Sequence, residues 1–230
     1  MRTFAWAGAT VFVVSLLHFA WRYFDAFGVV VDAPMAMAIQ PALINLGLFS
    51  AFALHHSLLA RSGAKTLLAR VIPPRLERST YVWVASLLFL AVCAWWQPVP
   101  GLLWRAEGSL VWLLRALSIV GAWLTLQSAA ALDMFDLAGT RPFMSPAPPA
   151  TELKSTGPYG LVRHPIYLAW LFLVWTPTTM TGTRLVFAAV STLYLVVAIP
   201  FEERSLHASI GPRYAVYVAA VRWRLVPWLY

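Results

Sequence analysis

The chain has 230 residues, of which 60% are hydrophobic, 14% aromatic and only 11% charged. Soluble globular domains are about a quarter charged, so this composition excludes an ordinary soluble domain, a disordered chain and a coiled coil. The same scarcity of charge argues against a nucleic-acid-binding domain despite the net charge of +8. One cysteine, Cys93, excludes a disulfide framework and a thiolate-bound zinc or iron–sulfur site. The composition therefore predicts a polytopic membrane protein.

Charge-free windows mark the expected membrane helices. A helix needs about 17 to 25 residues to cross ~30 Å of hydrocarbon, and irregular backbone cannot face lipid. The expected fold is therefore all-α, a polytopic membrane helix bundle of about six helices, five to six of them transmembrane, with the last two forming a hairpin. The windows without Asp, Glu, Lys or Arg are residues 3–21, 33–60, 79–104, 116–132, 165–183 and 185–201.

The basic residues predict the orientation of these helices, because Lys and Arg accumulate in short cytoplasmic loops. Of the 17 Lys and Arg residues, all but Arg22, Arg105, Arg115 and Arg184 fall on one side of a six-helix arrangement. This division places both termini in the cytoplasm. We expect an N-terminal four-helix membrane region over residues 1–132 and a C-terminal core over residues 133–230, which contains a cytosolic loop, the helix hairpin and an interfacial tail.

The last two windows bring charged residues together at the cytoplasmic membrane surface. Pro165 predicts a helix start after His164, where free N–H groups attract an anion, and Arg163 and Lys154 add positive charge. The tandem glutamates at 202–203 favour a cation. A ligand with a carboxylate, an ammonium group and an aromatic ring, such as S-adenosylmethionine, would find partners here. The alternative is an interfacial salt-bridge cluster that only flanks a helix hairpin.

Several motifs resemble a known family. The sequences GPY at 157–159, VRHPIY at 162–167, EE at 202–203 and GPRY at 211–214 closely resemble the isoprenylcysteine carboxyl methyltransferase superfamily of integral membrane methyltransferases. Within that superfamily the upstream half is most similar to the bacterial methanethiol S-methyltransferases, through motifs such as DLAGTR at 136–141. The resemblance implies a membrane methyltransferase.

The resemblance also implies the cofactor S-adenosylmethionine, bound at the cytosolic ends of the last helices. The family pattern implies contacts from the motif residues and from one of the two tandem glutamates. Arg163 is expected to join them because of its positive charge. The residues expected to bind the cofactor are Thr151, Glu152, Leu153, Lys154, Tyr159, Arg163, His164, Pro165, Ile166, Tyr167, Glu202 and Glu203.

One departure from the family bears on the methyl acceptor. Members that methylate an isoprenylcysteine carboxylate hold it with an arginine about four residues before the glutamate, and here those positions are Ala198 and Ile199. A carboxylate in such an apolar lining is unpaired, which costs several kcal/mol. We therefore expect a small neutral thiol, methanethiol by resemblance, which is converted to dimethyl sulfide.

A general base for the thiol is the least determined role. His56 lies near the cytoplasmic end of the second window, where a neutral imidazole is able to accept a proton. The alternative is that His56 is an interfacial hydrogen-bonding residue.

Other functions stay open from the sequence. They are methylation of another lipophilic acceptor such as an isoprenylcysteine carboxylate, a non-catalytic membrane accessory protein, and a haem protein with ligands drawn from His18, His55, His56 and His164. No metal site and no obligate protein partner is expected. The membrane lipid is the other expected partner.

Overall fold

The computed structural model describes residues 1–59, 71–144 and 153–230. Helices dominate, and a single two-stranded sheet accompanies them in these ranges. The long helices are α1 (Arg2–Phe24), α2 (Ile39–Leu59), α4 (Glu77–Trp95), α5 (Ser109–Ala131) and α9 (Gly182–Ile210). The shorter elements are α6 (Met134–Leu137), α7 (Pro158–Leu161), α8 (Pro165–Trp175), α10 (Pro212–Ala220), the strands β1 (Leu102–Arg105) and β2 (Thr179–Thr181), and the 3-10 turns Ala26–Gly28, Met35–Ala38, Pro74–Leu76 and Arg141–Phe143.

The expected membrane bundle is confirmed. Within the described ranges, the helical segments containing α1, α2, α4, α5 and α9 are each long and apolar enough to cross a membrane. They correspond to the first four charge-free windows and the last one. The protein is thus an integral, multi-pass membrane protein.

Two windows were extended too far. The helix expected over 165–183 is only the 11-residue α8, about 16 Å long at 1.5 Å per residue, which is too short to span the bilayer. The helix expected over 79–104 ends at Trp95. Prolines follow both ends, at Pro177 in one case and at Pro98 and Pro100 in the other, and proline cannot continue a helix without losing a hydrogen bond. Each segment then runs into a strand.

The chain divides into two compact units. The first comprises Met1–Arg105, Met134–Ala147 and Thr179–Val190, and the second comprises Ala106–Asp133, Pro148–Thr178 and Ser191–Tyr230. Helix α9 passes from the first unit into the second.

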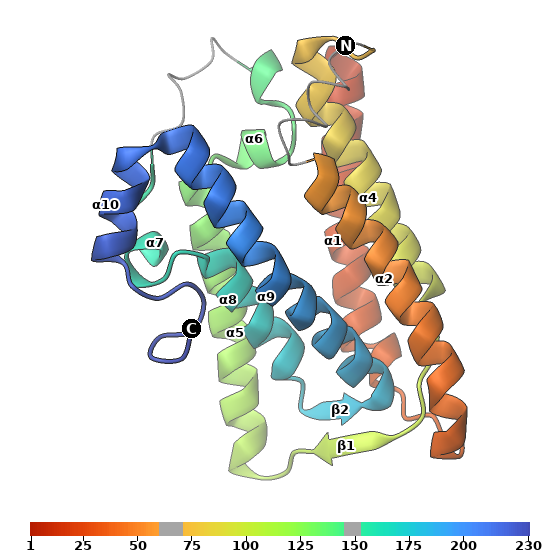
Figure 1. Ribbon diagram of the computed structural model, residues 1–230. Helices are drawn as coiled ribbons and strands as arrows, with labels where there is room; N and C mark the ends of the chain where they lie inside the picture. Colours follow the sequence, from red (N-terminus) through yellow and green to blue (C-terminus); the bar gives the residue numbers. More distant parts are fainter. Residues whose placement is uncertain (60–70, 145–152) are drawn as a thin grey trace. The chain divides into compact units, whose positions relative to one another are not determined.

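Helices α1, α2 and α4 build the first unit, and α4 packs against both of the others (Figure 1). An aromatic cluster surrounds the fully buried Phe187, whose ring centroid lies 5.0 to 5.9 Å from those of neighbouring rings. Below it, β1 pairs antiparallel with β2. Buried Arg184 donates to the carbonyl oxygens of Tyr23, Phe24 and Thr179, so it caps the carboxyl end of α1. The rings around Phe187 are those of Phe19, Tyr23, Phe27, Phe49 and Trp96.

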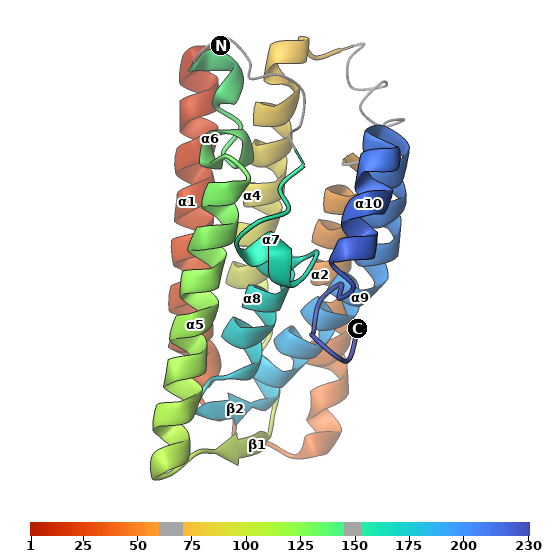
Figure 2. The same ribbon diagram turned by 90° about the vertical axis from the view of Figure 1, so that its left-hand side faces the viewer.

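In the second unit α8 lies along α5 (Figure 2). The two helices approach closely at Gly121, where a Cβ atom would stand 2.8 Å from the Cβ of Phe172 and 3.1 Å from the Ala169 carbonyl oxygen. Small residues permit such close contacts between membrane helices. This packing fixes α8, and with it the position of the helix start at Pro165. The buried core of the unit contains Leu124, Val162, Leu168, Ala169, Ile199 and Leu225.

Candidate functional site

The expected helix start is present in the second unit. Gly157 has φ of +60°, a conformation that favours glycine, and precedes the single turn of α7. The chain then extends at Val162, and His164 is the N-cap residue of α8, with Pro165 in its first turn. Proline is well suited there, since the first N–H of a helix has no intrahelical partner. The sequence thus turns the backbone sharply at Arg163 and His164.

The segment after α10 runs beside this turn. The backbone N–H of Arg163 donates to the Trp223 carbonyl oxygen and the N–H of His164 to that of Arg224, both at 2.9 Å. Residues about 60 positions apart are therefore held side by side by backbone hydrogen bonds. The positions of the Arg163 and His164 side chains therefore depend on the segment after α10.

The Arg163 side chain is buried, with 5% of its surface exposed, and donates three hydrogen bonds. Its Nε donates to Glu203 Oε1 at 2.6 Å, and its Nη1 donates to the carbonyl oxygens of Val221 and Arg222 at 2.8 and 2.7 Å. Charge-assisted bonds of this kind are about twice as strong as neutral ones. Arg163 therefore ties the turn, α9 and the segment after α10 together.

The tandem glutamates differ in their surroundings. The Glu203 side chain is 8% exposed, and its second oxygen accepts a hydrogen bond from Arg224 Nε at 2.9 Å. Both of its oxygens are thus engaged by arginines. The Glu202 side chain is 43% exposed, and its Oε2 accepts a hydrogen bond from the Tyr167 hydroxyl at 2.9 Å. Glu202 is the carboxylate that is accessible to a ligand.

His164 lies beside both carboxylates. Its ring stacks on Tyr167 with centroids 5.3 Å apart and planes 6° from parallel. Its Nδ1 is 3.6 Å from Glu202 Oε2 and its Nε2 is 3.4 Å from Glu203 Oε1. The Nε2 atom is buried and has no hydrogen-bond partner among the described residues. A buried polar atom without a partner is costly, and it is consistent with a ligand-binding position.

Tyrosines join α7 to α10. The Tyr217 hydroxyl donates to the Tyr159 carbonyl oxygen at 2.8 Å. Burial raises the pKa of Tyr217 to about 12, and burial likewise raises the pKa of Tyr159 and of Tyr214. The hydroxyl of Tyr217 therefore stays protonated near neutral pH and keeps its role as a donor.

The remaining expected contacts are placed as follows. Leu153 packs on the cluster formed by Tyr214, Tyr217 and Val221, and Lys154 is exposed. Pro165 is buried and Ile166 is partly buried at the start of α8. Thr151 and Glu152 lie outside the described residues. The structure thus brings together Tyr159, Arg163, His164, Pro165, Ile166, Tyr167, Glu202 and Glu203 in one unit.

His56 belongs to the first unit, in α2. Its Nδ1 lies 2.6 Å from the hydroxyl oxygen of Tyr81 on α4. Its ring is 5.7 Å from that of Phe52, so the pair stands in aromatic surroundings. Among the described residues, no group of three His, Cys, Asp or Glu side chains is arranged to hold a metal ion.

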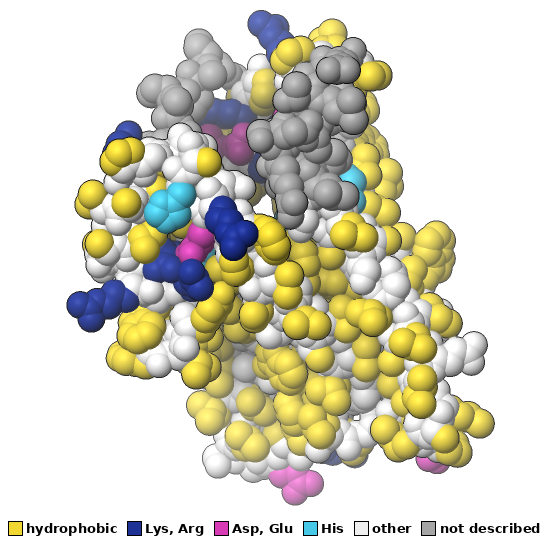
Figure 3. Space-filling view, viewed as in Figure 1, with side chains coloured by type: hydrophobic (Ala, Val, Ile, Leu, Met, Phe, Trp, Pro, Cys, Tyr) yellow, Lys and Arg dark blue, Asp and Glu magenta, His cyan; other side chains and the backbone are white. Residues whose placement is uncertain are grey.

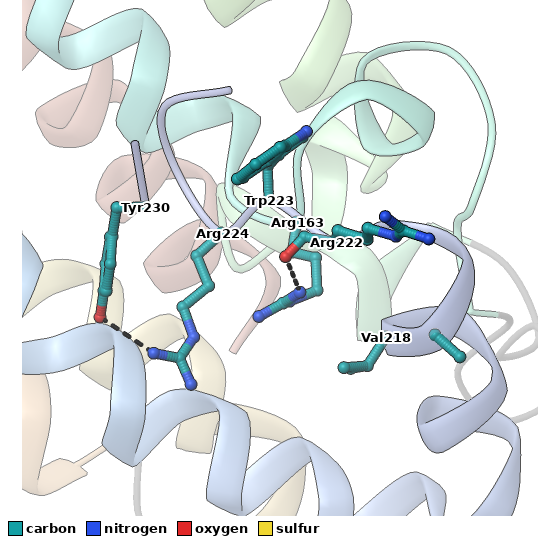
Figure 4. A pocket seen from close by; sticks show the side chains of 7 residues that line it. Arg163, Val218, Arg222, Trp223, Arg224 and Tyr230 are labelled. Atoms are coloured by element: carbon teal, nitrogen blue, oxygen red, sulfur yellow. Dashed lines mark hydrogen bonds between the residues drawn. The ribbon is translucent and has the colours of Figure 1, made fainter. Parts of the chain in front are cut away.

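The segment after α10 adds further charged and aromatic groups to this region. A cavity of about 460 Å³ lies against it, lined by Arg163, Val218, Ala219, Arg222, Trp223, Arg224 and Tyr230 (Figure 4). Basic side chains also gather on the surface around α10, whereas apolar side chains cover much of α9 (Figure 3).

Comparison with known proteins places the chain in a family. Residues 111–211 match the phospholipid methyltransferase family. Methanethiol S-methyltransferase 2 of Bradyrhizobium diazoefficiens is 34% identical over 98% of this chain and 88% of its own length. The chain belongs to the methanethiol S-methyltransferase family. A second member of the methanethiol S-methyltransferases, from Mycobacterium tuberculosis, is 35% identical over 96% of this chain and 94% of its own length.

The matched family and these relatives are all named methyltransferases, which confirms the resemblance expected from the sequence motifs. Membership implies an enzyme that uses a methyl donor. Nurim of Xenopus laevis is also similar, at 31% identity over 66% of this chain and 58% of its own length. No solved structure matches the chain.

Proposed function

We propose that this membrane protein transfers a methyl group from S-adenosylmethionine to methanethiol and releases dimethyl sulfide and S-adenosylhomocysteine. The activity agrees with the names of relatives that align with nearly the whole chain. The observation that carries the choice of donor is the accessible Glu202 carboxylate beside the stacked rings of His164 and Tyr167. S-adenosylmethionine carries an ammonium group, a sulfonium and an aromatic base, which suit these partners.

The binding roles of the expected residues can be divided. Glu202 would accept the ammonium group of the cofactor, beside Nδ1 of His164. The ring of Tyr167 would offer a stacking surface at the same place. Glu203 and Arg163 bond each other, and both oxygens of Glu203 are engaged by arginines, so we assign these two residues the role of holding His164 and Glu202 in position. Thr151, Glu152, Leu153 and Lys154 stay proposed contacts.

When bound, S-adenosylmethionine supplies an electrophilic methyl carbon on a sulfonium sulfur. The thiolate sulfur of the acceptor would take this methyl group, and the electron pair of the broken sulfur–carbon bond would remain on S-adenosylhomocysteine. The protein contributes chiefly by alignment of the reactants. The proton lost by the thiol needs an acceptor, because free thiols titrate above neutral pH.

We propose that His56 is the general base that accepts this proton. Its ring is held by the Tyr81 hydroxyl, which lies 2.6 Å from Nδ1, and this makes Tyr81 a positioning residue. A neutral imidazole is able to accept a proton near neutral pH, which is the chemistry that a general base requires.

The membrane setting suits these substrates. We propose a bacterial inner membrane location with both termini in the cytoplasm, where the charged cofactor arrives from the cytosol and the neutral thiol through lipid. Residues 133–230 would carry the cofactor contacts and residues 1–132 the remaining membrane helices. The only partners proposed are the thiol, the cofactor and lipid.

The decisive experiment uses the full chain in a mild detergent with methyl-labelled S-adenosylmethionine. It is incubated with methanethiol in one arm and with a farnesylated cysteine analogue in the other, and label is measured in volatile and non-volatile products. We expect label in dimethyl sulfide. Label in the farnesylated product alone would overturn the choice of acceptor, and the absence of S-adenosylmethionine binding at millimolar concentration would favour a non-catalytic accessory role.

A further inference from the structure

The cavity beside α10 has an unusual charge balance. Three guanidinium groups line it, from Arg163, Arg222 and Arg224, and no carboxylate lines it. Glu203 pairs with two of these arginines from outside the lining, so three positive charges face one negative charge. The region is therefore attractive to an anion. S-adenosylmethionine carries a net positive charge, because its one carboxylate is outweighed by an ammonium and a sulfonium group, so an anionic ligand matches this cavity better.

Arg222 is the arginine with binding capacity left. Its backbone carbonyl accepts a hydrogen bond from Arg163, but its side chain is exposed and forms no ion pair or hydrogen bond with the described residues. Figure 4 shows the guanidinium of Arg224 directed to the Tyr230 hydroxyl, at 3.4 Å, whereas Arg222 extends away from that pair. A free guanidinium that lines the same cavity as two other arginines is suited to the oxygens of a phosphate group.

The apolar surroundings indicate where the phosphate comes from. The indole of Trp223 lines the cavity and lies 6.3 Å from the ring of Trp228. Trp228 and Leu229 are 85% and 81% exposed, although they follow directly on this basic segment. Exposed indole and leucine side chains beside arginines are typical of a segment that lies in the membrane interface. A soluble phosphate ion would contact only the arginines, whereas a lipid would contact the arginines with its headgroup and the apolar side chains with its acyl chains.

We propose that this cavity binds the phosphate headgroup of an anionic membrane lipid through Arg222, with Trp223, Trp228 and Leu229 next to its acyl chains. The volume of about 460 Å³ lies within the range of small-molecule sites and accommodates a phosphoglycerol headgroup. The same segment supplies the carbonyl oxygens that hold Arg163 and His164. A bound lipid would therefore stabilise the segment on which the cofactor site depends.

The test is native mass spectrometry of the full chain in a non-ionic detergent. Phosphatidylglycerol and phosphatidylcholine with identical acyl chains are titrated in separate arms, and inorganic phosphate is added as a competitor. The variant is Arg222→Gln, and the matched control is Arg213→Gln, which removes the same charge from an exposed position on α10 outside the cavity. The side chain of Arg222 bonds none of the residues that the structure describes, so its substitution should leave the protein folded.

We expect phosphatidylglycerol to bind more tightly than phosphatidylcholine. Loss of one arginine near an anionic headgroup costs about fivefold in affinity, so Arg222→Gln should weaken phosphatidylglycerol binding about fivefold while Arg213→Gln changes it less than twofold. Equal effects of the two variants would overturn the proposal. Binding of inorganic phosphate without the lipid would overturn lipid as the ligand, and competition by S-adenosylmethionine for the lipid would assign the cavity to the cofactor instead.

Discussion

Arg163 and Glu203 are 40 positions apart in the chain, and their side chains meet at 2.6 Å in the buried part of the second unit. The neighbouring Glu202 leaves its carboxylate accessible. Two adjacent glutamates therefore have different physical tasks, one inside the fold and one at its surface.

The two tasks predict different effects of one chemical change. Glu203→Gln removes the charge that compensates buried Arg163, and breaking such a buried pair costs about 3 kcal/mol or more. It should lower the thermal unfolding temperature clearly. Glu202→Gln should leave that temperature nearly unchanged and weaken S-adenosylmethionine binding about tenfold, since a charge-assisted bond contributes about 1.5 kcal/mol. Calorimetric titration and thermal unfolding of both variants measure this; weakened binding in Glu203→Gln only, without destabilisation, would reverse the assignment.

The proposed base predicts a pH-dependent loss of turnover. His56→Ala should reduce kcat about 100-fold near neutral pH, a typical contribution of general base catalysis, with the dissociation constant of the cofactor unchanged. At alkaline pH the thiol ionises by itself, so the deficit should shrink. Tyr81→Phe, which removes the partner of His56 Nδ1, should show a smaller deficit with the same pH trend. A deficit that is constant across pH would rule out the proton-transfer role.

The contact between α5 and α8 predicts a strong response to one methyl group. Gly121→Ala places a Cβ 2.8 Å from the Phe172 Cβ, and such overpacking costs about 1 to 3 kcal/mol. Gly47→Ala is the matched control, because a Cβ at that glycine of α2 meets nothing within 4 Å. We expect Gly121→Ala to lower the thermal unfolding temperature and Gly47→Ala to leave it unchanged or raised. Equal behaviour would mean that the two helices do not pack at Gly121.

The buried tyrosines predict sensitivity to alkaline pH. Burial raises the pKa of Tyr217 to about 12, above the ordinary value near 10, so the folded state holds its proton more tightly than the unfolded state does. The resulting stability is complete below pH ~10 and is lost as the pH rises toward 12. Thermal unfolding between pH 9 and 12 should show this decline. Tyr217→Phe should show a smaller decline, and an identical slope would contradict the linkage.

Much of the fold could be predicted from the sequence, because a span without charge is readily recognised and lipid allows little besides a helix. The fifth window failed for a local reason. Its composition stays apolar through residue 183, while the proline at 177 and the strand after it end the helix at Trp175. Apolar content indicates where a chain avoids water, but it does not distinguish a spanning helix from a shorter one buried in protein.

The part of the candidate site that is formed by side chains could be predicted from the sequence. The motif around Arg163 and the tandem glutamates named the residues that the structure brings together. Its backbone partners could not be found in this way, because the carbonyls of Val221 and Arg222 have no signature in the sequence. Arg224, whose Nε bonds Glu203, resembled any other arginine of a cytoplasmic tail.

The bonds between the turn at Arg163 and the segment at Val221 to Arg224 also set an order of events during synthesis. Until that segment has left the ribosome, the guanidinium of Arg163 lacks the two carbonyls that hold it, and the backbone N–H groups of Arg163 and His164 lack their acceptors. Helices α1, α2, α4 and α5 can enter the membrane during translation. The site can assemble only after the translation of residue 224, so a nascent chain that stalls earlier would carry the motif without its function.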